Sequence, residues 1–317
     1  PLSNSRPFLL DIDKDLNFCF VQASARSLGD ANFITRKGLG YDPGTEHKFP
    51  MAGYRTAVTR RSAGYIFHTA FCGSTLLARA LHSPPDVVAL KEPNILLELS
   101  LASTRWPNGT FAPYLETALA EITQPWSSNG HVIIKPSNSC NRIVTDICSQ
   151  SRDDRFVFMF STLEEFLVSC IKKMPQAQTQ LNLMARHLLP GSALERACEI
   201  PRNIDFSIIE ACVLVWYVSL EYFSRAIEIL PDGSWVSVQY RDLKRDPMAV
   251  VQSVGRHCRL PEAVLTEEVL NAKLHEDSKS TGKAYDGLKY RQAYDAVYTA
   301  YGDAIKQGLD WADSYVS

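Results

Sequence analysis

The sequence predicts an α/β fold of three layers, with a mostly parallel central sheet flanked by helices on both faces. From about residue 60 onward, short apolar stretches alternate with longer stretches of helical spacing, and strands that are joined through helices pair in parallel. The 317 residues, 45% hydrophobic and 21% charged, are enough to bury a large core. Polar motifs follow the predicted strands, which is where ligands of such sheets bind.

The expected elements follow the chain in order. Residues 1–60 should form an N-terminal extension of mixed strand and loop packed on the core, and residues 61–317 the main domain. Apolar runs predict strands at 65–68, 87–90, 131–135, 155–160 and 235–240. Apolar residues at helical spacing predict helices at 74–81, 93–101, 114–122, 141–148, 163–173, 207–230, 247–258 and 289–305.

Charge and composition exclude several classes of protein. A net charge of -2 leaves no global electrostatic footprint for nucleic acid. No apolar run reaches the roughly 18 residues of a membrane span, and we expect no signal peptide. The eight cysteines have no C-x-x-C spacing, so we expect no metal and a reducing, cytoplasmic location.

The strand–turn–helix at residues 65–81 is the strongest indication of a ligand. Gly73 lets main-chain N–H groups approach an anion, and Ser74 and Thr75 add hydroxyl donors at the positive end of the helix dipole. A plain turn with a Ser/Thr cap would explain the same residues. A Walker A loop fits poorly, because no lysine precedes Ser74.

Residues 70–77, Ala-Phe-Cys-Gly-Ser-Thr-Leu-Leu, resemble the 5′-phosphosulfate loop of the P-loop sulfotransferase superfamily, which has roughly P-[KR]-S-G-T-T-x-L after a strand. The resemblance implies a P-loop-type fold. It also implies donor contacts from Phe71, Cys72, Gly73, Ser74, Thr75 and Leu76. Phe71 stands where the family has a basic residue.

Two later strand ends resemble catalytic segments of that family. Lys91-Glu92-Pro93 is similar to the acidic turn that supplies the catalytic base in the protein-tyrosine and bacterial branches. Lys135 matches the lysine that faces the cleft, whereas Ser137 replaces the histidine base of the cytosolic branch. We therefore place the chain nearer the former branches, with Glu92 as the base. Solvated charges at strand ends are the alternative explanation.

The cation missing at Phe71 needs a substitute, because charge develops on the leaving phosphate oxygen during sulfuryl transfer. Lys91, Lys135 or His68 would supply it. Together with Glu92 as general base, these residues form the expected catalytic group.

The segment from 155 to 169 resembles the strand and helix that bind the donor's 3′-phosphate, "fvhlhRdPrdvvaS". Ser169 matches the motif serine, and Ser161 replaces the arginine. One lost charge-assisted hydrogen bond costs about 1.5–3 kcal/mol, which Lys172, Lys173 or Lys283 would offset. Alternatively, Ser161-Thr162-Leu163-Glu164 is a capping box that starts a helix without any ligand.

Two further segments complete the resemblance. Residues 235–247 are similar to the family's late "v-x-Y-E-D-L-x-x-D-P" segment, which implies that Tyr240 lies near the adenine. Asp242 and Pro247 in the same segment shape a turn. Ser280-Thr281-Gly282-Lys283 falls where the family closes a basic loop over the 3′-phosphate, so Lys283 is the last candidate contact.

The resemblance implies a sulfotransferase that uses 3′-phosphoadenosine 5′-phosphosulfate and a hydroxyl or amine of a small-molecule acceptor. A P-loop phosphotransferase using a nucleoside triphosphate is one alternative. A non-catalytic nucleotide-binding descendant is the other, favoured by Phe71 and Ser161. A homodimer is left open. Aromatic residues that would either line an apolar acceptor pocket or belong to the core are Trp106, Trp126, Trp216, Tyr217 and Tyr222.

Overall fold

A small antiparallel sheet opens the chain in the computed structural model, which describes residues 5–41, 44–106, 111–150, 152–198, 206–274 and 287–313. β1 (Ser5–Ile12) pairs with β2 (Asn17–Ser24), and β2 pairs with β3 (His47–Pro50). Apolar side chains of β1 and β2 belong to the same buried cluster as one face of the main sheet. The N-terminal sheet is therefore packed on the core rather than separate from it.

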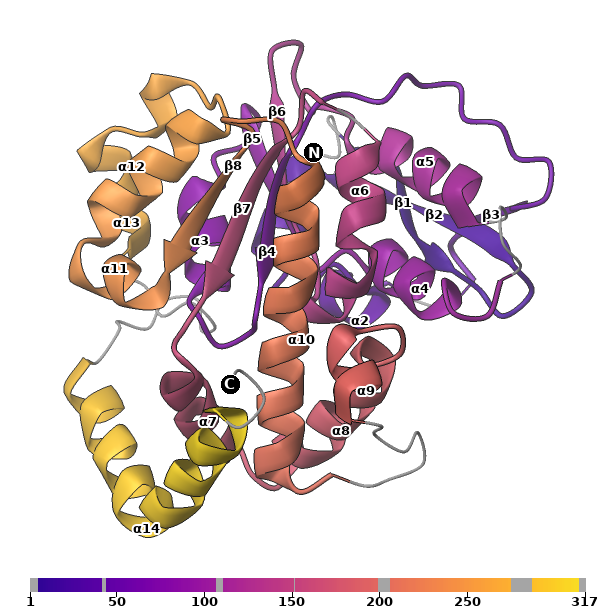
Figure 1. Cartoon of the computed structure of the whole chain (residues 1–317). Helices are drawn as coiled ribbons and strands as arrows, with labels where there is room; N and C mark the ends of the chain where they lie inside the picture. The colour runs from indigo at the N-terminus through magenta and orange to yellow at the C-terminus, as the bar shows by residue number, and fades with distance from the viewer. Residues whose placement is uncertain are drawn as a thin grey trace.

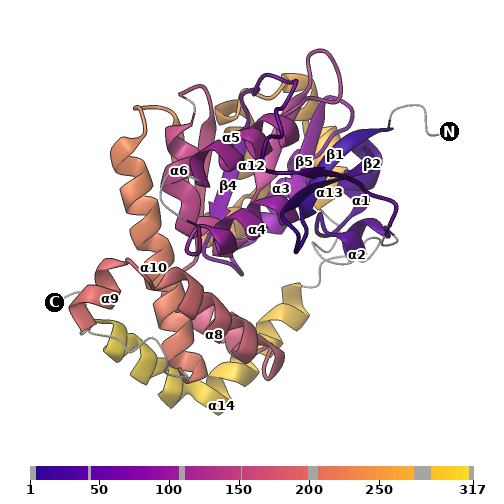
Figure 2. The same cartoon turned by 90° about the vertical axis from the view of Figure 1, so that its right-hand side faces the viewer.

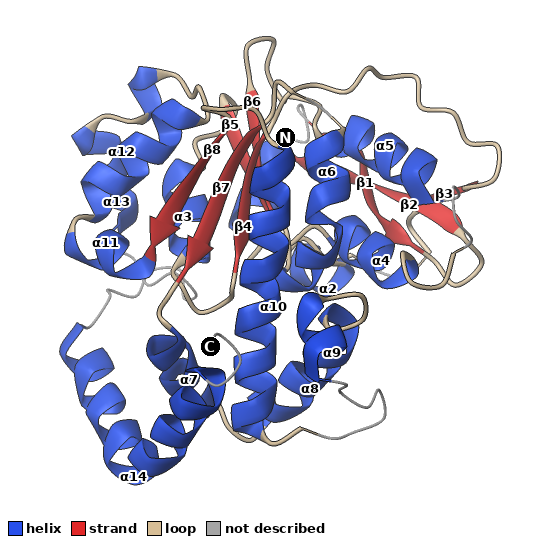
Figure 3. Ribbon diagram, in the orientation of Figure 1, coloured by secondary structure: helices blue, strands red, loops and turns tan. Residues whose placement is uncertain are grey.

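The main sheet has five strands, all paired in parallel, in the order β5-β6-β4-β7-β8 (Figures 1 and 3). The strands are β4 (Gly64–His68), β5 (Val87–Lys91), β6 (His131–Lys135), β7 (Arg155–Phe160) and β8 (Trp235–Gln239). Every residue of β4 and β5 is buried, which explains why these strands are continuous apolar runs in the sequence.

The order in which the chain adds strands to the sheet reverses at β4. The chain leaves β4 for the edge strand β5, returns to β6 beside β4, and then crosses to β7 on the other side of β4. In open parallel sheets, ligands bind outside the carboxyl ends of the strands at such a reversal. The ends of β6, β4 and β7 are therefore the expected location of a site.

Helices cover both faces of the sheet (Figure 1). One buried cluster joins Ile66 and Val157 to α3 (Ser74–Leu81), α12 (Pro247–His257) and α13 (Glu267–Leu274). The other joins Phe67 and Phe158 to helices on the opposite face. These are α5 (Phe111–Ile122), α6 (Val144–Ser149) and α10 (Ile208–Ile229).

A group of helices lies beyond the carboxyl ends of the strands (Figures 1 and 2). It contains α7 (Leu163–Ile171), α8 (Gln176–Leu188) and α14 (Gly287–Asp313), and α10 contacts all three. The remaining elements are α1 (Ala25–Asp30), α2 (Arg36–Leu39), α4 (Asn94–Ala102), α9 (Ala193–Cys198), α11 (Tyr240–Arg245) and the 3₁₀ helices η1 (Asn138–Ile143) and η2 (Glu262–Val264).

The predicted fold class is confirmed, and each predicted strand of the main sheet lies within one residue of its observed bounds. The prediction of one helix over 141–148 is wrong in part, because η1 runs to Ile143 before α6 begins. The sequence pattern also missed α8, whose apolar residues are sparse between polar ones. Within the described residues, no helix has both the length and the apolarity that a membrane span requires.

Candidate functional site

The turn between β4 and α3 has a rarely adopted backbone. Ala70 (φ 69°), Phe71 (φ 51°) and Gly73 (φ 79°) all lie in the left-handed region. Among the described residues, five non-glycine residues have positive φ; Ala70, Phe71 and Glu92 (φ 51°) are three of them, and each follows the carboxyl end of β4 or β5. Residues held in such conformations concentrate at functional sites, so the strain marks this edge of the sheet.

The helix α3 begins without a side-chain cap. Gly73 is its N-cap residue and, having no side chain, supplies no cap to the first turn. The N–H of Leu77 bonds to the carbonyl of Gly73 at 3.1 Å, so the amides of residues 74–76 precede the regular helical bonds. Such first-turn amides and the helix dipole together favour an anion.

Cys72 and Ser74 flank the glycine but face the interior. Cys72 is fully buried in the core beneath α3, and burial raises the pKa of its thiol to about 11. Ser74 is also buried, whereas Thr75 is partly accessible. The turn therefore offers main-chain N–H groups and the Thr75 hydroxyl, and Cys72 is a core residue rather than a reactive thiol.

Tyr240 lies directly against this turn. A Cβ atom added to Gly73 would come within 3.1 Å of Tyr240 Cε2 and 2.7 Å of Leu243 Cδ2. The ammonium of Lys244 sits 4.7 Å from the centre of the Tyr240 ring and bonds to Glu165 Oε1 at 2.7 Å. The glycine is thus required both by its φ and by the close approach of α11.

Lys173, which follows the C-terminal end of α7, lies over the side chain of Phe71 in the turn. Lys173 Nζ is 3.7 Å from the centre of the Phe71 ring, a cation–π contact. Phe166 packs on the same ring at 5.8 Å between centroids. A positive charge is therefore present beside the turn, although it comes from another element.

Glu92 and Lys135 form an ion pair at the ends of β5 and β6. The Glu92 side chain is 28% exposed, whereas that of Lys135 is 1% exposed. The Glu92 N–H also donates to the carbonyl of Lys135 at 2.7 Å. The Glu92 carboxylate is thus the accessible member of the pair, and the buried ammonium of Lys135 fixes its position.

Lys91 has a different environment from Lys135, although the two are neighbours across β5 and β6. Its ammonium donates to the carbonyl of Gly29 in α1, and its side chain is buried. Burial, assisted by the charge of Arg79, lowers the pKa of Lys91 to about 8. Lys91 thus connects β5 to the N-terminal segment.

His68 at the end of β4 uses both ring nitrogens on the main chain. Nδ1 accepts from the Ala70 N–H at 3.0 Å, so the proton is on Nε2, which donates to the carbonyl of Pro136 at 3.1 Å. Burial, with the nearby charge of Lys135, holds the pKa of His68 well below its usual range. A neutral His68 therefore joins the loops that follow β4 and β6.

Two buried hydroxyls at the ends of β4 and β7 have no hydrogen-bond partner within the described residues. They belong to Thr69 and Ser161, both fully buried. Trp216 of α10 donates its indole N–H to the Ser161 carbonyl at 2.9 Å, which fixes the main chain there. Buried polar atoms are normally paired, so two unpartnered hydroxyls at adjoining strand ends are an unusual feature of this edge of the sheet. Thr69 was not among the predicted site residues, although its position directly after β4 was the available signal.

The remaining sequence candidates have varied surroundings. Ser169 lies partly buried in α7, Leu76 packs against the core beneath α3, and Lys172 forms the C-cap of α7. Lys283 and its Ser-Thr-Gly neighbours lie outside the described residues. The five aromatic residues proposed for an acceptor pocket all pack on or within the main core cluster. In the described ranges, no three His, Cys, Asp or Glu side chains gather as metal ligands would.

No model of a known protein family matches the sequence, and no curated protein does. Several solved structures resemble the fold. A sulfotransferase domain from the curacin biosynthetic pathway shares 11% identity over 71% of this chain and 82% of its own, with a TM-score of 0.42. A sulfotransferase from Alicyclobacillus acidocaldarius shares 11% over 78% and 97%, with a TM-score of 0.43.

A third similar structure is the sulfotransferase domain of the Synechococcus PCC 7002 olefin synthase, with 13% identity over 83% of this chain and 97% of that domain, and a TM-score of 0.41. Similarities at this level do not establish a shared activity. What the chain does must therefore be argued from its own residues.

Proposed function

We propose that this protein is a sulfotransferase that moves a sulfuryl group from 3′-phosphoadenosine 5′-phosphosulfate to a hydroxyl or amine of a small-molecule acceptor. One observation carries the proposal: an accessible carboxylate, Glu92, stands at the same sheet edge as an uncapped, glycine-started helix. The first is suited to accept a proton and the second to hold an anionic donor.

The donor's 5′ end fits the turn between β4 and α3. The side chains of Tyr240 and Leu243 already cover the Cα of Gly73, so the groups that we assign to the phosphate are the main-chain amides of residues 74–76, which precede the helical bonds. Thr75 adds a hydroxyl, and the buried hydroxyls of Thr69 and Ser161 lie at the adjoining strand ends. In this arrangement Tyr240 has its ring at the edge of the turn, where we place the adenosine.

In the transfer step, the acceptor oxygen or nitrogen forms a bond to sulfur while the bond from sulfur to the 5′-phosphate oxygen breaks. Glu92 takes the proton that the acceptor loses, and the electron pair of the broken bond stays on the phosphate. Lys135 is too buried to touch either reactant, so we assign it to positioning Glu92. The amides at the start of α3 stabilise the charge that develops on the leaving phosphate.

The cation beside that phosphate is Lys173 in this proposal. Lys135 is paired with Glu92, Lys91 donates to Gly29, and His68 is neutral. Lys173 lies with its ammonium over the ring of Phe71, which belongs to the turn. Because a lysine stem is long and flexible, its ammonium can move from the ring onto a bound anion.

Binding of the reaction product tests the donor site. Calorimetric titration with adenosine 3′,5′-bisphosphate should give saturable binding, and ATP with magnesium should give none at the same concentrations. Preference for ATP with magnesium would instead support a P-loop phosphotransferase. Binding of the bisphosphate with no transfer to any of a panel of phenols, alcohols and amines would support a non-catalytic descendant.

Glu92→Gln tests the base. Labelled-donor transfer should fall about 100- to 10,000-fold, with bisphosphate affinity unchanged, because the amide oxygen still accepts from Lys135 but cannot take the acceptor's proton. Glu262→Gln is the control: Glu262 is an exposed residue paired with Arg256 at 3.0 Å, and its variant should transfer at the normal rate. Full activity in Glu92→Gln would remove the base assignment.

A further inference from the structure

The N-terminal segment crosses the end of β5 and bonds to it on both sides of Glu92. The N–H of Ile34 donates to the carbonyl of Lys91 at 2.8 Å, and the N–H of Asn94 donates to the carbonyl of Ile34 at 3.0 Å. One fully buried residue of the N-terminal segment therefore brackets the turn that contains the carboxylate.

The bracketed turn has a conformation that its own sequence disfavours. Glu92 has φ 51° and directly precedes Pro93. A residue before proline is biased toward extended conformations, and a non-glycine residue rarely takes positive φ. External hydrogen bonds must therefore hold the turn, and those to Ile34 and Lys135 are the ones present at this point.

Lys91 adds a third link between the same two segments. Its ammonium donates to the carbonyl of Gly29, within the helix that precedes Ile34. Gly29 itself packs closely on His82 at the C-terminal end of α3, since an added Cβ would lie only 1.8 Å from His82 Nε2. The strand end on one side of Glu92 is thus fixed to α1.

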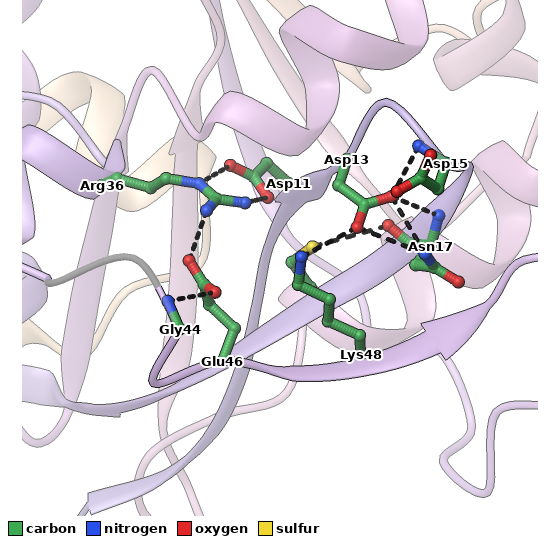
Figure 4. A network of polar contacts seen from close by, with 9 residues as sticks. Asp11, Asp13, Asp15, Asn17, Arg36, Gly44, Glu46 and Lys48 are labelled. Atoms are coloured by element: carbon green, nitrogen blue, oxygen red, sulfur yellow. Dashed lines mark hydrogen bonds and ion pairs between the residues drawn. The ribbon is translucent and has the colours of Figure 1, made fainter.

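Ile34 is in turn held by an ion network, drawn in Figure 4. Arg36, two residues further on, donates to both carboxylate oxygens of Asp11 at 2.8 and 2.9 Å and also pairs with Glu46. Glu46 accepts from the Gly44 N–H at 3.2 Å. The loop that carries Ile34 is thereby anchored to β1 and to the chain entering β3.

We infer that the N-terminal segment is part of the catalytic machinery, because Ile34 and Lys91 fix the direction in which the Glu92 carboxylate points. This inference rests on the proposed function. Both residues are positioning residues: they act on the reaction through Glu92 and touch neither donor nor acceptor.

Lys91→Met tests the inference, because methionine keeps most of the side chain's volume and removes its N–H donors. Transfer should fall about 10- to 100-fold in kcat, the loss expected for a misplaced catalytic group, with donor KM and bisphosphate Kd changed less than about threefold. Lys91→Arg, which can still donate to Gly29, should recover much of kcat. Lys48→Met, which breaks the 3.0 Å ion pair with Asp13 in the same sheet, should leave kcat unchanged.

If Lys91 acts through Glu92, the effects of substituting the two residues on turnover should not add. The double variant Lys91→Met/Glu92→Gln should be no slower than Glu92→Gln alone, since there is no base left to misplace. If the two losses multiply, or if Lys91→Met turns over normally, the inference is overturned. If Lys91→Met does not fold, Arg36→Met takes its place, because Arg36 is partly exposed and anchors the loop that carries Ile34. The loss in kcat is then compared between Arg36→Met, Glu92→Gln and the double variant.

Thermal unfolding separates this inference from the proposed function, because it needs neither donor nor acceptor. Glu92→Gln should lower the midpoint by less in the Lys91→Met background than in the unchanged protein. Equal decreases would overturn the positioning role even where transfer is observed. A chain that binds no bisphosphate and transfers nothing, yet has unequal decreases, would remove the proposed function and leave the structural coupling standing.

Discussion

The turns that lead from β4 into α3 and from β7 into α7 lie side by side at one edge of the sheet but begin their helices differently. At α7, Thr162 Oγ1 accepts from the Glu165 N–H at 3.2 Å and Glu165 Oε2 accepts from the Thr162 N–H at 3.3 Å. This capping box satisfies first-turn amides with the chain's own side chains. At α3, the N-cap is Gly73, with no side-chain cap.

The difference separates a helix start that is complete in itself from one suited to a ligand. Thr162 has an ordinary extended backbone (φ -62°, ψ 155°). Ala70, Phe71 and Gly73, in the other turn, all have positive φ. Strain at a turn persists when surrounding structure maintains it, and it is often part of function. We therefore place the anion at α3 and assign α7 to support.

Of the substitutions that test this comparison, Gly73→Ala should have the largest effect on stability and on bisphosphate binding. The new Cβ would meet Leu243 at 2.7 Å and Tyr240 at 3.1 Å at a φ of 79°, so unfolding free energy in urea should fall by about 2–4 kcal/mol, and bisphosphate binding should fall with it. Gly233 has φ 75° but open space around it, so Gly233→Ala should cost only about 1–2 kcal/mol and leave binding intact. Undiminished binding in Gly73→Ala would exclude this turn as the anion site.

Lys173→Met should have the next largest effect, on affinity rather than stability. A charge-assisted hydrogen bond contributes about 1.5–3 kcal/mol, so the calorimetric Kd for the bisphosphate should rise about 10- to 150-fold. Lys37→Met, at an exposed position of α2, is the control and should change Kd by less than threefold.

A rescue variant sharpens that prediction. Phe71→Lys in the Lys173→Met background returns a cation to the turn itself, and it should restore most of the lost affinity. Unaltered binding in Lys173→Met, or equal losses in the two single lysine variants, would contradict the role given to Lys173.

His68→Gln tests how the turn between β4 and α3 is held in place. The pKa of His68 is far below its usual range in the folded protein, because the ring is buried and near Lys135. The unfolded chain takes up that proton below about pH 6.5, so folded-state stability must fall as pH drops below that value. Glutamine can accept from Ala70 and donate to Pro136 without titrating. The slope of unfolding free energy against pH between 6.5 and 5 should therefore lessen by up to about 1.4 kcal/mol per pH unit; equal slopes would rule out a buried neutral ring.

Much of the main sheet could be predicted from the sequence, because its strands are buried on both faces and their apolar runs are continuous. The helix start at Ser74 was also predicted correctly. The capping box was placed one residue too early: the cap is Thr162 with Glu165, which leaves the Ser161 hydroxyl unpartnered within the described residues. Two hydroxyl residues, Ser161 and Thr162, and two glutamates, Glu164 and Glu165, allow either register in the sequence. In the structure the main chain at Ser161 is bonded instead to the indole N–H of Trp216.

The candidate site was less predictable, because its contacts join segments far apart in the chain. Glu92 and Lys135 could be singled out as charges ending strands, yet nothing local indicates that Lys91 donates to Gly29 or that Lys173 lies over Phe71. Ile34 is an ordinary apolar residue in the sequence. Its importance comes from main-chain bonds to Lys91 and Asn94, which residue type does not encode.

Thr162→Ala should have the smallest effect and completes the contrast. Losing the cap should lower unfolding free energy by about 1 kcal/mol, and Ser207→Ala at the equivalent capping box of α10 should cost about the same. Neither substitution should change the bisphosphate Kd by more than twofold, because the Thr162 N–H and the Glu165 N–H are already bonded to the chain's own side chains at the start of α7. A tenfold weaker Kd in Thr162→Ala alone would mean that the start of α7 also contacts the nucleotide, and the division between an open and a closed turn would then be wrong.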